Sequence, residues 1–124
     1  MSKTIALVDD SSTILMSVSG ILRREGFQVE QFDNAEAALA KLNSGLVPDL
    51  LITDLHMPGM DGIAFIKEAR KISKLRFKPI LFLTTESQQE KRAEAKAAGA
   101  TGWLVKPVQG AQLLEVVKQV LPGA

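Results

Sequence analysis

Short apolar runs that lead into an acid or a lysine constrain this chain more than any other feature. Such runs precede four charged residues at three places along the sequence: Asp9, Asp10, Asp54 and Lys106. Continuous apolar runs of this length are typical of strands buried on both faces of a parallel sheet. The carboxyl ends of such strands share one edge of the sheet, where ligands bind. The pattern therefore predicts one pocket that contains three carboxylates and one amine.

Strand-like and helix-like patterns alternate along the whole chain. Apolar residues at helical spacing, often preceded by a capping Ser or Asn and followed by Gly, separate the strand-like runs. Strands are expected at residues 5–8, 27–32, 49–53, 80–83 and 102–105, and the second of them alternates as an edge strand does. This order predicts an α/β fold: a single doubly wound (βα)5 domain over residues 1–124, with a five-stranded parallel sheet, helices on both faces and a flavodoxin-like topology.

Composition excludes several classes of protein. The 15 basic and 14 acidic residues of the 124-residue chain nearly cancel, which argues against a nucleic-acid partner. The absence of cysteine excludes disulfides and thiolate metal sites. No apolar run approaches the roughly 20 residues of a membrane helix, and no signal-peptide core follows Met1. We therefore expect a cytoplasmic monomer that does not bind membranes.

The acidic residues have the chemistry of a magnesium site. Adjacent side chains on a strand point in different directions, so Asp9 and Asp10 are expected to play different roles. Asp10 and Asp54 are the better direct ligands of Mg²⁺, Asp9 would act through water, and the His56 carbonyl could add an oxygen. Each acid alone is better explained as a helix cap or loop residue. Three together beside Lys106 favour a cation, because close carboxylates repel one another.

Four segments of the chain resemble the response-regulator receiver domain of the chemotaxis CheY type: residues 7–11, 54–62, 83–86 and 102–107. The resemblance implies that Asp54 is the phosphoacceptor, phosphorylated by a CheA-like histidine kinase. It implies that Asp9, Asp10, Asp54 and the His56 carbonyl hold Mg²⁺, with Mn²⁺ as a substitute. The protein would then be no enzyme but a signalling domain, with only self-catalysed phosphoryl transfer and autodephosphorylation.

The same resemblance assigns roles around the phosphoryl group. Lys106 would contact that group, in a cis peptide with the following proline, and Thr84 would supply the switch hydroxyl. His56 and Glu86 would tune the phosphoryl lifetime, although the His56 side chain is equally well a solvated loop residue. Trp103 stands at a switch position where the family usually has Tyr or Phe, which leaves the amplitude of an aromatic swing open.

A partner surface is expected on the fourth helix, fifth strand and fifth helix, and the residues proposed for it are Gln89, Arg92, Trp103 and Val105. The polar, alanine-rich character of this helix also fits a plain solvated face that docks weakly. Phosphorylation-dependent binding there would control a downstream protein such as the flagellar motor switch, and a phosphatase would be a further partner. Phosphate sink and phosphorelay intermediate remain alternative roles.

Two other classes of function fit less well. A magnesium-dependent small-molecule phosphatase of the haloacid-dehalogenase type has D-x-D after its first strand, whereas this chain has adjacent Asp9 and Asp10. A nucleotide-binding protein would carry a glycine-rich phosphate loop after that strand, and none is present in the sequence.

Overall fold

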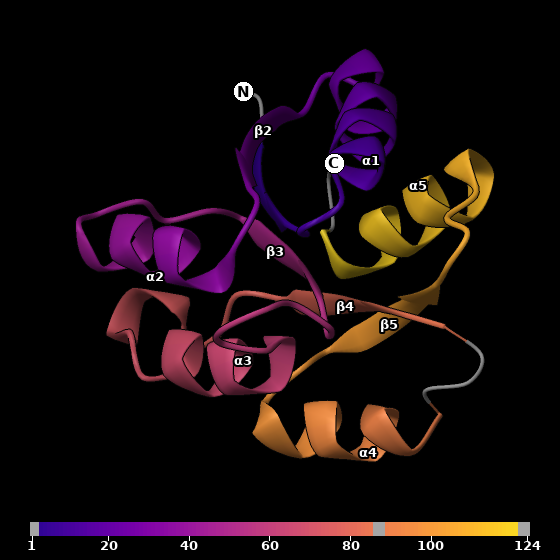
Figure 1. Ribbon diagram of the computed structural model, residues 1–124. Coiled ribbons are helices and arrows are strands. Elements are labelled where there is room, and N and C mark those ends of the chain that lie inside the picture. Colours follow the sequence, from indigo (N-terminus) through magenta and orange to yellow (C-terminus); the bar gives the residue numbers. More distant parts are fainter. Residues whose placement is uncertain (1–2, 86–88, 122–124) are drawn as a thin grey trace.

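A parallel sheet with helices on both faces forms the centre of the computed structural model, which describes residues 3–85 and 89–121 (Figure 1). The strands pair in the order β2-β1-β3-β4-β5, and every pairing is parallel. This arrangement confirms the predicted fold and the predicted edge position of the second strand. The elements in chain order are β1 (Thr4–Val8), α1 (Ser12–Arg24), β2 (Gln28–Phe32), α2 (Ala35–Asn43), β3 (Leu50–Asp54), α3 (Gly62–Arg70), η1 (Ser73–Leu75), β4 (Ile80–Thr84), α4 (Gln89–Ala98), β5 (Gly102–Val105) and α5 (Gly110–Val120).

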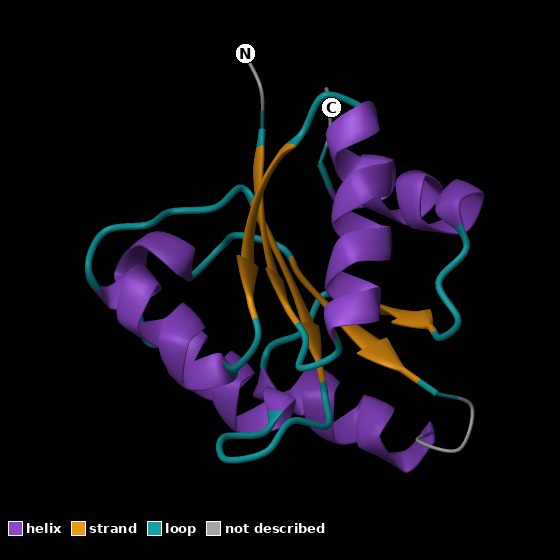
Figure 2. Cartoon of the chain, turned by 45° about the horizontal axis from the view of Figure 1, so that its top comes forward, coloured by secondary structure: helices purple, strands orange, loops and turns teal. Residues whose placement is uncertain are grey.

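Two apolar layers fix the helices on the sheet. Helices α2, α3 and α4 cover one face (Figure 1). Phe65 of α3 and Phe82 of β4 belong to the apolar cluster on that side. Helices α1 and α5 cover the other face (Figure 2). Leu22, Val117 and Leu81 belong to the apolar cluster on that side. The central strands are buried on both sides, which explains their uninterrupted apolar sequences. No helix within residues 3–85 and 89–121 is long and apolar enough to cross a membrane.

Side-chain caps begin three of the helices. Ser11 accepts a hydrogen bond from the Ile14 amide at 3.3 Å, and Asn34 accepts one from the Ala37 amide at 2.7 Å. Asp61 caps α3 in the same way, a role that the sequence had not indicated. The glycines predicted to end helices all have positive φ angles, which residues with a Cβ rarely adopt: Gly26, Gly45 and Gly99.

The structure corrects the bounds of four predicted strands. β1 begins at Thr4 rather than residue 5, β2 begins at Gln28 rather than residue 27, and β4 ends at Thr84 rather than residue 83. β3 begins at Leu50 rather than residue 49, and the Asp49 carboxylate accepts a hydrogen bond from the Thr4 amide just before the strand. It extends to Asp54, which pairs in register with Leu83, so the acid belongs to the strand and not to the loop after it. The short helix η1 was not expected.

Arg70 joins three segments at the end of the sheet opposite the carboxyl ends of the strands. Its guanidinium donates to the carbonyls of Leu75 and Lys78 at 2.7 Å each, and to that of Arg76 at 3.1 Å. Two further nitrogens donate to the Gly99 carbonyl at 2.7 and 3.0 Å. This one side chain therefore connects α3 to the segment before β4 and to the turn after α4.

Candidate functional site

Three carboxylates meet at the carboxyl ends of β1 and β3. One oxygen from each of Asp9, Asp10 and Asp54 lies within 4.8 Å of the others. β1 and β3 are neighbours, with Val8 opposite Thr53, so both strands deliver their acids to the same place. Asp9 is completely buried and Asp10 is exposed, as expected for adjacent side chains that point in different directions. The predicted convergence of these three residues is confirmed.

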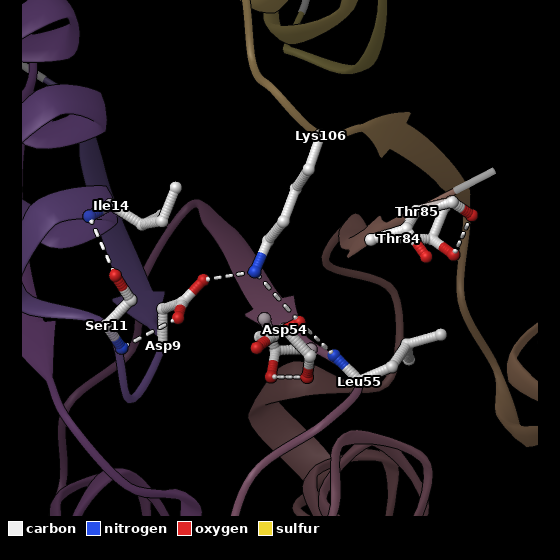
Figure 3. A network of polar contacts seen from close by, with 9 residues as sticks. Asp9, Ser11, Ile14, Asp54, Leu55, Thr84, Thr85 and Lys106 are labelled. Carbon is white, nitrogen blue, oxygen red and sulfur yellow. Dashed lines mark hydrogen bonds and ion pairs between the residues drawn. The ribbon is translucent and has the colours of Figure 1, made fainter. Parts of the chain in front are cut away.

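The amine of Lys106 lies between two of these acids (Figure 3). Its Nζ atom is 3.1 Å from Asp9 Oδ2 and 3.2 Å from Asp54 Oδ1. The lysine follows β5, so its side chain crosses the end of β4 to reach the cluster. Its backbone amide donates to the Thr84 carbonyl at 2.7 Å, which fixes the start of that side chain. The Lys106-Pro107 peptide bond is cis, as the resemblance implies.

Backbone amides orient the two buried acids. The Ser11 amide donates to Asp9 Oδ1 at 2.9 Å, and the Leu55 amide donates to Asp54 Oδ1 at 2.8 Å (Figure 3). Such bonds favour the ionised carboxylate and hold it in one orientation. The sequence analysis did not identify these contributions, because the donor is the main chain and no residue type marks it.

The turn after Asp54 packs tightly against the first residue of α3. The Gly62 amide donates to the Leu55 carbonyl at 2.9 Å. A Cβ on Gly62 would overlap the Asp54 carbonyl oxygen and lie 2.7 Å from the Leu55 Cα. A residue without a side chain is therefore required beside the acid. On the other side of the turn, Glu36 of α2 accepts a hydrogen bond from the Met60 amide at 3.0 Å. Neither contact was predicted.

Charge in the site is unbalanced. Burial raises the pKa of Asp9, and the negative charge of Asp54 raises it further. The Ser11 amide and Lys106 lower this pKa, but the net shift is upward. Burial by itself lowers the pKa of Lys106, but the Asp54 and Asp9 carboxylates outweigh it, and the net pKa is raised. One ammonium group faces three carboxylates, so an ionised site has excess negative charge. Clustered hard oxygen donors with unneutralised charge suit Mg²⁺, which prefers such ligands.

Thr84 lies at the adjacent strand end. It is buried, and its hydroxyl donates to the Thr85 carbonyl at 3.2 Å (Figure 3). The His56 side chain is exposed, in agreement with a solvated loop residue. Glu86 lies outside the described residues, and of Gln89 only the place at the start of α4 is described.

The remaining predicted residues form a second group on α4 and β5. Trp103 is 37% exposed, and Val105 is half-buried on the same strand. The Arg92 guanidinium lies over the indole, with Cζ 5.1 Å from its centroid. Lys96, which the sequence analysis did not single out, contacts the same ring. Its position four residues after Arg92 is the only signal that could have indicated it.

Comparisons with known proteins agree with this arrangement. The family model described as the response regulator receiver domain matches residues 5–118. CheY-3 of Vibrio cholerae is 38% identical over 117 residues, which cover 94% of this chain and 89% of the relative. CheY of Pseudomonas aeruginosa is 36% identical over 117 residues, which cover 94% of this chain and 94% of the relative.

Solved structures give the same result. The crystallised chemotaxis protein CheY4 of Vibrio cholerae superimposes with a TM-score of 0.92 at 43% identity, over 98% of this chain and 100% of that one. A receiver domain from a sensor histidine kinase of Pseudomonas aeruginosa has a TM-score of 0.87 at 25% identity, over 97% of this chain and 98% of that one. That structure is described as having a magnesium ion coordinated in its active-site cleft.

The chain belongs to the response regulator receiver family, whose members are signalling domains of two-component systems rather than enzymes in the ordinary sense. Its relatives of the chemotaxis CheY type match nearly their full length.

Proposed function

We propose that residues 1–124 act as one receiver domain that accepts a phosphoryl group on Asp54 and signals by binding another protein, in chemotaxis. The observation that carries this proposal is the Lys106 amine, held within 3.2 Å of Asp54 and beside a second buried acid. An ammonium group in this position neutralises charge on the oxygens of a phosphoryl group in transfer. A CheA-like histidine kinase is the proposed donor.

Asp54 is a better nucleophile than Asp9. Both oxygens of Asp9 are engaged, one by Ser11 and one by Lys106. Within residues 3–85 and 89–121, the hydrogen bond and the ion pair of the Asp54 carboxylate both fall on Oδ1. Oδ2 is therefore the atom proposed to attack phosphorus. The new O–P bond forms as the P–N bond of the donor phosphohistidine breaks, and the released imidazole takes a proton from solvent.

The oxygen donors present fit a divalent cation. Asp10 and Asp54 are the proposed direct ligands, with the His56 carbonyl, and Asp9 is the proposed water-mediated one. Mg²⁺ would supply positive charge beside the transferring oxygens, and Mn²⁺ would substitute for it. The chain itself contributes the orientation of the acids, through the Ser11 and Leu55 amides, and the fixed charge of Lys106.

The response to phosphorylation is proposed to run through Thr84 and Trp103. A phosphoryl group adds nearly two negative charges and strong acceptor oxygens, which can draw in the Thr84 hydroxyl. The Trp103 ring would then turn inward and change the surface formed by Gln89, Arg92, Trp103 and Val105. His56 and Glu86 are proposed to influence the lifetime of the acyl phosphate. The flagellar motor switch is the proposed target, and a phosphate sink or relay role would use the same chemistry without it.

Trp103 fluorescence provides the test. The protein is titrated with beryllofluoride or acetyl phosphate in the presence of Mg²⁺. We expect a fluorescence change that requires Mg²⁺ and is lost in Asp54→Ala. A response that persists unchanged in Asp54→Ala would show that Asp54 is not the acceptor. Binding to an isolated motor-switch protein only in the presence of beryllofluoride would support the motor role over the sink and relay roles.

A further inference from the structure

The single tryptophan of the chain is covered by two cations from α4. Arg92 Cζ lies 5.1 Å and Lys96 Nζ lies 5.6 Å from the Trp103 ring centroid. The ring also packs against Phe82 on the neighbouring strand, with centroids 6.1 Å apart and planes inclined by 32°. Residues four apart on a helix lie on the same face, so both cations approach the indole from α4. Cations within about 6 Å of an aromatic centroid are attracted by the ring quadrupole.

This contact matters because few other described side chains of α4 pack against the sheet. Among its side chains that the structure describes, only Ala95 is fully buried. Alanine buries much less apolar area than the leucines and valines that anchor α1 and α5. The stack on Trp103 therefore adds to a contact in which α4 otherwise offers the apolar layer only small side chains such as Ala95 and Ala98.

The Arg92 guanidinium is also partly removed from water. Its Nε atom is buried and has no hydrogen-bond partner among the described residues. A cation that has lost part of its hydration is attracted more strongly to a ring face than an exposed one is. Arg92 is therefore expected to contribute more than Lys96, which is exposed.

We propose that Arg92 and Lys96 hold the Trp103 indole in its half-exposed position and thereby couple the ring to α4. An inward rotation of the indole would separate it from both cations. The two residues thus act as positioning residues that oppose the rotation. Their effect on activation rests on the proposed function, whereas their hold on the resting ring does not.

The resting hold is tested first, without Mg²⁺ or a phosphoryl analogue. Gln replaces Arg92, Lys96 or both, since it removes the charge and has a similar helix propensity. Lys91→Gln is the matched control: it removes the same charge from the same helix, where Lys91 pairs with Glu94 at 3.8 Å. Each lost cation should change the ratio of held to released indole about two- to fivefold. Trp103 emission and acrylamide quenching report that ratio.

We expect the double variant to show an emission maximum shifted to shorter wavelength and weaker acrylamide quenching, because the released indole turns inward, with or without Asp54→Ala in the same chain. The proposal is overturned if the double variant matches the unaltered protein, or if Lys91→Gln gives the same change. Persistence of the effect in the Asp54→Ala background separates this test from that of phosphorylation. If the unaltered protein gave no response to beryllofluoride, the proposed function would be refuted, but the proposed hold of Arg92 and Lys96 on the resting ring would not be.

The effect on activation is tested by beryllofluoride titration at saturating Mg²⁺. The double variant should bind the analogue more tightly, by about the same two- to fivefold factor for each cation removed. Lys91→Gln should leave the midpoint unchanged. An unchanged midpoint in the double variant, together with altered resting fluorescence, would overturn the opposition to rotation.

Discussion

Replacement of Gly62 by alanine should destabilise the protein although it adds only one methyl group. The added Cβ would overlap the Asp54 carbonyl oxygen and lie 2.7 Å from the Leu55 Cα. Both neighbours are backbone atoms of a turn whose geometry is fixed by the Gly62 amide, which bonds the Leu55 carbonyl at 2.9 Å. Neither neighbour can move as a flexible side chain would, so α3 or the end of β3 must shift.

The expected magnitude follows from two opposing effects. Overpacking of a well-filled site costs about 1–3 kcal/mol, and contact with backbone on two sides places Gly62 at the upper end. The reduced entropy of the unfolded chain returns about 0.4–1 kcal/mol. The free energy of unfolding should therefore fall by about 2 kcal/mol, measured by urea denaturation with circular dichroism. The beryllofluoride response should weaken as well, because the displaced turn carries the Leu55 amide that orients Asp54.

Gly20 offers the matched control. It lies inside α1, and a Cβ there would meet only Arg24 Nη2, at 3.7 Å. Gly20→Ala should raise the free energy of unfolding by about 0.5–1 kcal/mol, because alanine favours a helix interior. The same glycine-to-alanine change should therefore lower the free energy of unfolding at Gly62 and raise it at Gly20. A Gly62→Ala protein as stable as the unaltered one would refute the steric argument.

Three further predictions concern single side chains. Arg70→Ala should lower the free energy of unfolding by about 3 kcal/mol in urea denaturation. Arg70→Lys should recover less than half of that loss, because an ammonium group cannot reproduce the several fixed donors of a guanidinium. Full recovery of stability by lysine would contradict this explanation. Phe65→Ala should cost about 3–5 kcal/mol, since Phe65 is wholly buried, whereas Phe77→Ala, at 91% exposure, should stay within about 0.5 kcal/mol by the same measurement. Because the folded pKa of Lys106 is raised above its ordinary 10.5, its ion pairs stabilise the protein fully below that pH and lose their effect as the pH rises through the folded value. The stability difference from Lys106→Met should therefore shrink above pH 10.5, and a constant difference would refute the assignment.

The sequence predicted the fold and the meeting of Asp9, Asp10, Asp54 and Lys106, because strand ends in a parallel sheet fix where those residues lie. It could not predict contacts that depend on close packing. The Ser11 amide carries no residue-specific signal. Other contacts looked ordinary: an arginine in the last turn of a helix is usually just exposed, and Arg70 gave no sign of the carbonyls that it binds.

The stack on Trp103 shows the same limit. Arg92 and Trp103 were both predicted to lie on one surface, but as separate members of a partner interface. Their contact depends on how closely α4 approaches β5, and Ala95, which α4 buries, is a residue too common to attract notice. A pattern that identifies which face a residue occupies does not identify what covers it.

The strand order has a consequence for synthesis of the chain. The acids lie at the ends of β1 and β3, whereas their ammonium partner follows β5. On the ribosome, the paired carboxylates therefore emerge long before the lysine that neutralises them. Until β5 joins the sheet beside β4, a nascent domain has clustered negative charge and lacks that counter-charge. Completion of the sheet therefore coincides with completion of the carboxylate–ammonium cluster, and a half-made chain lacks the full site that is proposed to accept the phosphoryl group.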